Sequence, residues 1–437
     1  MTENSNIEKQ IKRNIYGKPQ SILVVFPPGL SVAANDEAQS ILSNLWFQNK
    51  FPSEMTVQKN ALRIDNIHMF AVMELLMRGK CFSDIRLIMS DRKVENVPSF
   101  EKSCYNINWD YYLASNMSLK IKVDVGGSPV LHEGAIKDIL SDGLRDLVSS
   151  IVTGDSVEET TTLYVDIFRY HAVMSISLAG APLYKRGYRS VLSHSAPLRE
   201  DMAAACIQNA LAFGLQNDES SLPDSMIIPF SGTGTFLIEY WMVAYQFSPV
   251  LFERTYAIQS MPLFRSENFN FLLKKAREHC GITELIPANY VCIDNADDAN
   301  TALLGNIENF NQAVLKNQLT WRGDEVAQCV KNNDFIKLTI DSSYEALAGN
   351  IFIPINPPYG IRFGKSKETG ALYQSIAKQI NALSALTKAN KKHVLGFILC
   401  PSEESWSLFC KTLTNATIDT YHLTQGGLDI RVAQFYL

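Results

Sequence analysis

The sequence predicts an α/β protein in two parts, in which a mixed α+β module precedes a doubly wound α/β domain. The length of 437 residues favours two or three domains, and a composition of 46% hydrophobic and 19% charged residues is that of a globular chain. Up to about residue 180 the expected strands and helices follow one another irregularly, and beyond it they alternate. Such alternation is typical of a parallel sheet covered by helices on both faces.

The elements expected in the N-terminal module, residues 19–180, follow from hydrophobic periodicity. In "NMSLKIKVDVGG" every second residue from Leu119 to Val125 is apolar, as in a strand with one buried face. In "HEGAIKDILSDGLRDLVSSIV" the apolar residues recur at helical spacing. Further strands are expected in "SILVVFPPG" and "TTLYVDIFRYHAVMSISLAG", a helix in "DEAQSILSNLWFQNKF", and a helix and a strand in "NIHMFAVMELLMRGKCFSDIRLIM".

The C-terminal domain, residues 181–437, is expected to contain successive β-α units. Right-handed crossovers between such strands predict a parallel sheet, and ligands of these sheets bind at the carboxyl ends of the strands. The expected strands are "SMIIPF", "YVCID", "FIKLTID", "NIFIPI" and "HVLGFILC", with helices that begin near residues 234, 297, 343, 367 and 403.

Several classes of protein are disfavoured by the bulk properties. No apolar run approaches the roughly 20 residues of a membrane span, and the N-terminus does not resemble a secretory signal, so we expect a cytoplasmic protein without a membrane partner. The eight cysteines and seven histidines are dispersed without metal-binding spacing, so no metal is expected. The net charge of −5 disfavours nonspecific nucleic-acid binding but is compatible with a local basic groove.

Polar residues and glycines mark the ends of four successive expected strands. Gly232 and Gly234 follow the first strand, where glycines permit tight turns and close approach of a cofactor to the next helix N-terminus. Asp294 ends the second strand, where an acid would bind ribose, and Asp341 ends the third, where it could contact adenine. Each aspartate could instead cap the following helix. Asn356 ends the fourth, and the coincidence indicates one binding crevice.

The fourth strand runs into Asn356-Pro357-Pro358-Tyr359. Prolines lack a backbone donor and fix φ, so this loop is rigid and presents carbonyl oxygens outward. The Asn356 amide oxygen and one such carbonyl could accept hydrogen bonds from an exocyclic amine on a base, with positioning carrying much of the rate. Tyr359 would stack on that base, after base flipping if the target lies in a helix. The alternative is an ordinary turn.

These motifs resemble those of the THUMP-domain class I methyltransferases, and particularly the bacterial 23S rRNA guanine-N2 methyltransferase L family. The resemblance covers nearly the whole chain and implies a Rossmann-like catalytic domain preceded by a ferredoxin-like and THUMP module that binds RNA. We expect a single methyltransferase domain, without the fused second one of this family. The similar segments are "GAIKDILSDGLRDLV", "PLYKRGYR", "APLREDMAAA", "PFSGTGTFLIE", "VCIDNAD", "INPPYGIRFG" and "LTQGGLDIRVAQFYL".

The resemblance also implies roles for individual residues. S-adenosylmethionine would be the cofactor, and Asn356 to Tyr359 would hold the guanine. Lys185, Arg186 and Arg189, interleaved with tyrosines, and Arg362 would contact RNA, although a solvated linker would look the same. The residues implied to border the cofactor are Pro197, Leu198, Pro229, Gly232, Gly234, Thr235, Asp294 and Asp341.

The cofactor loop departs from the family pattern at two positions. Ser231 stands where the family has cysteine, and Ile228 stands where it has aspartate. The missing carboxylate should face the methionine ammonium, and its loss could weaken cofactor binding by about 1.5–3 kcal/mol. Glu239, one helical turn further on, is retained.

Three functions are compatible with these features. The first is methyl transfer from S-adenosylmethionine to the exocyclic N2 of a guanine in 23S rRNA, free or in an assembly intermediate. The second is N6 methylation of adenine in RNA or DNA, because Asn-Pro-Pro-Tyr suits any planar exocyclic amine. The third, motivated by Ile228, is a non-catalytic RNA-binding ribosome assembly factor.

Overall fold

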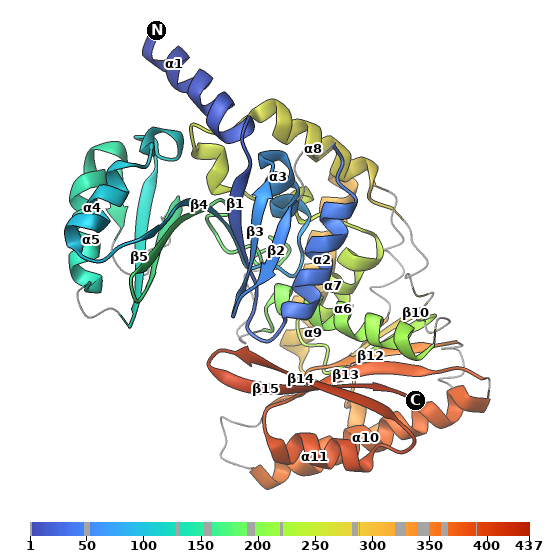
Figure 1. Cartoon of the computed structure of the whole chain (residues 1–437). Coiled ribbons are helices and arrows are strands. Elements are labelled where there is room, and N and C mark those ends of the chain that lie inside the picture. The colour runs from blue at the N-terminus through green and yellow to red at the C-terminus, as the bar shows by residue number, and fades with distance from the viewer. Residues whose placement is uncertain are drawn as a thin grey trace. The chain divides into compact units, whose positions relative to one another are not determined.

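The protein is described by a computed structural model (Figure 1) that covers residues 2–47, 53–127, 131–152, 160–189, 197–218, 222–281, 287, 289–319, 329–339, 349–359, 366–389 and 391–437. The chain divides into two compact units. Unit 1 comprises Met1–Phe26, Asn35–Lys185 and Arg254–Lys275, and unit 2 comprises Pro27–Ala34, Arg186–Glu253 and Ala276–Leu437. Each unit therefore includes a short segment that lies within the sequence of the other.

Unit 1 is built on a sheet of eight strands in the order β2-β3-β1-β4-β8-β7-β5-β6. Its strand pairs are antiparallel except that β5 runs parallel to both β6 and β7. In Figure 1, α4 and α5 lie on the same side of β5. The mixed α+β architecture expected here is confirmed, while its assignment as a ferredoxin-like and THUMP module remains a prediction.

The elements before residue 180 are α1 Thr2–Ile11, a π-helix Lys12–Tyr16, β1 Gln20–Val25, α2 Ser31–Ser43, β2 Glu54–Val57, β3 Ala61–Ile67, α3 Met69–Arg78, β4 Asp84–Lys93, α4 Val97–Tyr105, β5 Ser118–Gly126, α5 Glu133–Leu144, β6 Ser150–Val152, β7 Thr161–Phe168 and β8 His171–Ser177.

Unit 2 is built on a seven-stranded sheet in the order β11-β10-β9-β12-β13-β15-β14. The strands from β9 to β13 pair in parallel, whereas β15 is antiparallel to both β13 and β14. The sheet is thus mixed rather than wholly parallel, because the chain closes with a hairpin. The strand order reverses beside β9, and such a reversal opens a crevice at the carboxyl ends of the strands.

The later elements are α6 Glu200–Asn217, β9 Ser225–Pro229, α7 Thr235–Ala244, α8 Ser266–Glu278, β10 Asn289–Asp294, α9 Asp297–Lys316, β11 Val330–Asn332, β12 Ile351–Ile355, α10 Ser366–Ala389, β13 Val394–Cys400, α11 Glu403–Thr412, β14 Thr417–Gln425 and β15 Leu428–Tyr436.

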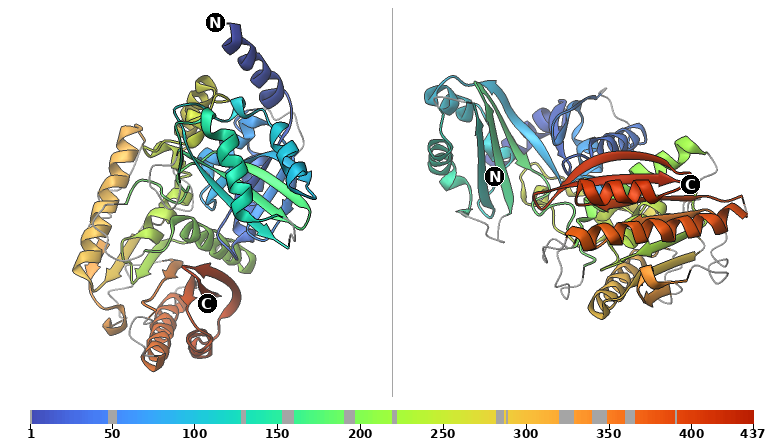
Figure 2. Two further views of the ribbon diagram at one scale, coloured as in Figure 1. Left: turned by 90° about the vertical axis from the view of Figure 1, so that its left-hand side faces the viewer. Right: turned by 90° about the horizontal axis from the view of Figure 1, so that it is seen from below.

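Helices on both faces explain why the central strands are apolar throughout. Viewed from below in Figure 2, α10 and α11 lie together along one face of the sheet. Their buried residues, among them Tyr373, Ile376 and Phe409, form one core with Ile227, Ile353 and further strand residues. Every residue of β9, β12 and β13 is buried, as expected for strands covered on both sides. Among the helices that the structure describes, none has the length and apolar character needed to cross a membrane.

The prediction of a third strand in "FIKLTID" is wrong for the residues of this segment that the structure describes. Asp334 accepts a hydrogen bond from the Ile336 backbone N–H at 3.0 Å and caps a 3-10 helix, Phe335–Lys337. Phe335 is buried in the core from within that helix. The third strand is instead β11, which lies just upstream. Period-two apolar spacing over so few residues does not distinguish a strand from a short capped turn.

Candidate functional site

The loop between β9 and α7 has a conformation that requires its glycines. Gly232 and Gly234 have φ values of 52° and 79°, in the left-handed region that favours glycine. A Cβ atom on Gly234 would lie 2.1 Å from Cδ1 of the buried Leu303. Over Gly232 the nearest atom to such a Cβ lies 4.0 Å away, so this side of the loop is open. The loop therefore packs closely against α9 and leaves space above Gly232.

Asp294 connects the ends of the first two strands of unit 2. Its Oδ2 accepts a hydrogen bond from the Gly232 N–H at 2.8 Å, and its Oδ1 accepts one from the Ala296 N–H at 3.0 Å. The predicted juxtaposition of Gly232 and Asp294 is confirmed. The second bond closes the turn before α9, whose N-cap is Ala296, so Asp294 is not the side-chain cap of that helix.

Asn356 lies at the end of β12, beside β9. The two strands are paired at Ile351 with Ser225, and each has five residues, so both end at the same level of the sheet. Within the described part of the chain, the buried Oδ1 atom of Asn356 has no hydrogen-bond partner. A buried acceptor left unpaired is costly, unless a ligand that is absent from the structure supplies the donor.

The remainder of the Asn-Pro-Pro-Tyr element is fixed to the hairpin that ends the chain. Pro357 is buried and Pro358 is exposed. The hydroxyl of the half-buried Tyr359 donates a hydrogen bond to Gln425 Oε1 at 3.0 Å. Burial raises the pKa of Tyr359, and the nearby Cys206 and Cys400 thiols act in the same direction, so the hydroxyl remains a donor at neutral pH.

Arg189 connects the cofactor loop to the segment that precedes α6. Its guanidinium donates to Thr233 Oγ1 and Thr235 Oγ1, both at 3.2 Å, and to the Leu198 carbonyl oxygen at 2.7 Å. It also forms an ion pair with Glu200 at 2.5 Å. The predicted cofactor residues Leu198 and Thr235 are therefore brought together, but by a residue that the sequence analysis assigned to RNA.

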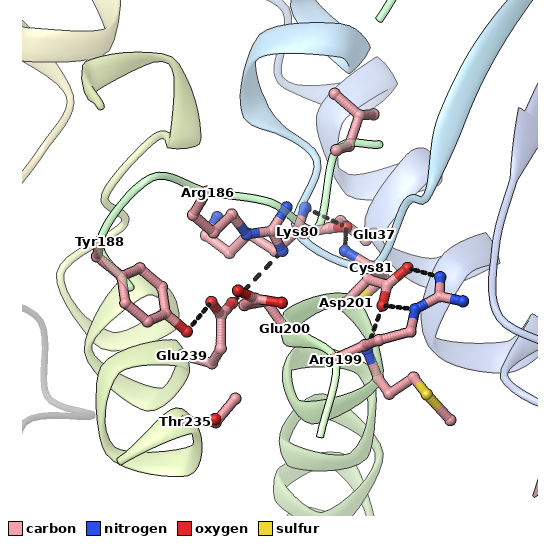
Figure 3. Close-up of polar contacts among 12 residues, drawn as sticks. Glu37, Lys80, Cys81, Arg186, Tyr188, Arg199, Glu200, Asp201, Thr235 and Glu239 are labelled. Carbon is pink, nitrogen blue, oxygen red and sulfur yellow. Dashed lines mark hydrogen bonds and ion pairs between the residues drawn. The ribbon is translucent and has the colours of Figure 1, made fainter. Parts of the chain in front are cut away.

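Arg186 is also placed differently from the prediction. Figure 3 shows the side chains of Arg186 and Tyr188 pointing toward the carboxylate of Glu239, with contacts of 3.4 and 3.1 Å. Arg186 and Glu239 are both completely buried. The prediction that Arg186 contacts RNA is wrong, because a guanidinium inside the core cannot reach an RNA strand at the surface. Lys185 is exposed, and its role stays a prediction.

Glu239 does not replace the carboxylate that Ile228 removes. Burial raises the pKa of Glu239 to about 7, against the lowering influence of Arg186. Both of its oxygens are engaged, by Arg186 and by Tyr188. Ile228 itself is fully buried in β9 and paired in register with Cys292. The methionine end of a cofactor would therefore meet no carboxylate at position 228.

Two predicted site residues, Asp341 and Arg362, lie outside the described residues. In the described ranges, no cluster of His, Cys, Asp and Glu side chains is suited to hold a metal ion. Two contributors were missed. The buried Asn306 donates to the Thr233 carbonyl oxygen at 2.8 Å, and Gln425 holds Tyr359. Asn306 could have been found from the sequence, because it places an amide on the apolar side of a helix. Nothing in the sequence marks Gln425.

Residues 186–391 match the family model described as "RMKL-like, methyltransferase domain". This stretch of the chain is similar to that methyltransferase domain. The match contains the glycine loop, Asp294 and Asn356, which the geometry above brings to one edge of the sheet. The match begins at Arg186, the residue with which this stretch of unit 2 begins.

Two named relatives are similar over part of their length. A Synechocystis protein named as an RNA methyltransferase is 26% identical over 293 residues, which cover 66% of this chain and 68% of the relative. The ribosomal RNA large subunit methyltransferase K/L of Pseudomonas paraeruginosa is 27% identical over 234 residues, which cover 53% of this chain but only 30% of the relative. The chain thus spans less than a third of the K/L protein.

The fold resembles a solved methyltransferase, SMU.472, complexed with S-adenosylhomocysteine. The TM-score is 0.70 at 17% identity, over 95% of this chain and 98% of that one. S-adenosylmethionine is the cofactor of the domain, and the residues present fit it. Ser231 Oγ is buried in the loop without a partner among the described residues, and the space above Gly232 is open. Gly232, Gly234 and Asp294 would hold the cofactor, which supplies the methyl group.

Proposed function

We propose that this protein transfers a methyl group from S-adenosylmethionine to the exocyclic N2 of a guanine in 23S rRNA, in the cytoplasm. The observation that carries the proposal is the unpaired, buried Oδ1 of Asn356, one strand away from the cofactor loop. An amine that donates to this oxygen would satisfy it. The names of the two relatives support RNA as the substrate class, and that of the K/L protein supports ribosomal RNA.

The chain contributes positioning rather than strong base catalysis. Asn356 Oδ1 and the carbonyl of a rigid proline would each accept one N–H of the amine, which aims the nitrogen lone pair at the methyl group. Transfer forms a nitrogen–carbon bond, breaks the sulfur–carbon bond and releases one amine proton to water. Tyr359 would stack on the base, a contact that contributes about 1–3 kcal/mol in single-stranded complexes.

RNA would be held by surfaces that do not include the buried Arg186. Lys185 is exposed and remains available to a phosphate, whereas Arg186 and Arg189 stabilise the domain internally. We propose that the module built on the eight-stranded sheet provides a second RNA contact. A second contact would raise affinity through the effective concentration of the linked site.

Nucleoside mass spectrometry tests the proposal. Ribosomal RNA from a strain without this protein should lack one N2-methylguanosine that reappears when the wild-type chain is restored. Loss of N6-methyladenosine instead would select the adenine alternative. Unchanged nucleosides, together with no heat of S-adenosylmethionine binding at millimolar concentration, would select the non-catalytic assembly factor.

A further inference from the structure

The β14–β15 hairpin reaches the base-binding element through one side chain. Gln425 is the last residue of β14 and is paired with Leu428, the first residue of β15. The two residues between them, Gly426 and Gly427, have φ values of 57° and 82°. Two such residues form the tight hairpin turn whose twist matches that of the strands. The position of Gln425 is therefore fixed by the end of a regular ladder.

The other side of the hairpin is braced by a segment from the beginning of the chain. The Thr424 N–H donates to the Pro28 carbonyl oxygen at 3.3 Å. Gly29, with φ of 90°, approaches β14 so closely that a Cβ atom on it would lie 1.9 Å from the His422 carbonyl oxygen. Pro27–Ala34 belongs to unit 2, like the hairpin. This segment therefore holds β14 just before Gln425, and the pairing with Leu428 of β15 holds Gln425 itself.

We infer that Gln425 is a positioning residue, whose amide oxygen fixes the ring of Tyr359 in the orientation that stacks on the target base. This inference rests on the proposed function. The contact joins Tyr359 Oη to Gln425 Oε1 at 3.0 Å, with the phenol as the donor. Pro358 restricts the backbone before Tyr359 but not the torsions of its ring. The hydrogen bond fixes these torsions before the base binds, so less conformational entropy is lost on binding.

Removal of the hydrogen bond should lower kcat/KM for RNA by about tenfold, since a neutral hydrogen bond contributes about as much free energy as a tenfold change in rate. The affinity for S-adenosylmethionine should not change, because Gln425 does not contact the glycine loop in the described structure. The melting temperature should fall by no more than the few degrees that loss of one neutral hydrogen bond costs. A purely structural role for Gln425 would lower the melting temperature and leave kcat/KM of the folded protein unchanged.

The experiment compares Tyr359→Phe, Gln425→Leu and the double variant with the wild type on unmodified 23S rRNA, with cofactor titration and thermal unfolding as controls. Each single variant should lose about tenfold in kcat/KM, and the double variant should lose no more, because one bond joins the two groups. Gln425→Glu keeps an acceptor oxygen and should restore most of the rate.

Three outcomes would overturn the inference. Gln425→Leu could be as active as the wild type, or the double variant could lose about a hundredfold, as expected for independent groups. These two results contradict the role of Gln425 while the proposed function stands. A wild-type protein that methylates no RNA base would remove both proposals. A wild-type protein that methylates adenine would leave the Gln425 comparison valid, since Tyr359 would stack on either base.

Discussion

Arg189 has two possible roles, because it was expected to contact RNA and its guanidinium also holds the glycine loop between β9 and α7. Arg189→Ala removes an ion pair with Glu200, whose side chain is only 4% exposed, and contacts to Thr233, Thr235 and Leu198. Loss of one partner of a buried pair costs about 3–5 kcal/mol. Because Arg189 is itself 22% exposed, we expect a loss nearer to about 2–3 kcal/mol in the free energy of unfolding.

The same change should weaken cofactor binding. Without Arg189, the loop must become ordered when the cofactor binds. If that ordering costs about 2 kcal/mol, the Kd for S-adenosylmethionine rises about 30-fold. Isothermal titration measures the Kd, and urea unfolding measures stability. Arg189→Lys is the matched control, since it keeps the charge near Glu200 but cannot span the same acceptors, so stability should recover more than affinity. An Arg189→Ala protein with unchanged cofactor affinity and weakened RNA binding would refute the internal role.

Two further predictions concern the surroundings of the loop. Gly234→Ala should abolish measurable cofactor binding, because it strains a φ of 79° and clashes with Leu303; Leu303→Ala in the same chain should recover part of the titration heat, and no recovery would contradict the clash. Burial raises the pKa of Glu239 from 4.5 to about 7, so the native state holds this proton when the unfolded chain has lost it. As the pH rises from 4.5 to 7, the free energy of unfolding of the wild type should therefore fall relative to that of Glu239→Gln. The difference should reach about 3 kcal/mol, at 1.36 kcal/mol per pKa unit. Parallel unfolding profiles of the two proteins would contradict the shift.

The strand ends of the methyltransferase domain could be predicted because they combine two independent signals. A buried strand has a continuous apolar run, and the polar or glycine residue that follows it, as at Gly232, Asp294 and Asn356, marks the edge of the sheet. The alternation of strands and helices then brings those edges together. The third strand was predicted wrongly, because Asp334 caps a short 3-10 helix whose apolar residues have the spacing of a strand.

Arg186 was misread because burial of a charge depends on distant partners. Arginines interleaved with tyrosines look the same in a solvated RNA groove and in a core. The buried Arg186 is paired with Glu239, 53 residues later, and Arg189 is paired with Glu200 on the next helix. Gln425 was missed for the same reason, because its partner Tyr359 lies 66 residues earlier in the chain.

The central claim is that Asn356 holds the amine that is methylated. The most direct measurement is mass spectrometry of nucleosides from unmodified 23S rRNA incubated with S-adenosylmethionine and either the wild type or Asn356→Ala. The wild type should form N2-methylguanosine, and the variant should form none while it binds the cofactor with nearly the same Kd, since Asn356 belongs to a different loop from the glycines. N2-methylguanosine formed by Asn356→Ala at the wild-type rate would contradict the account.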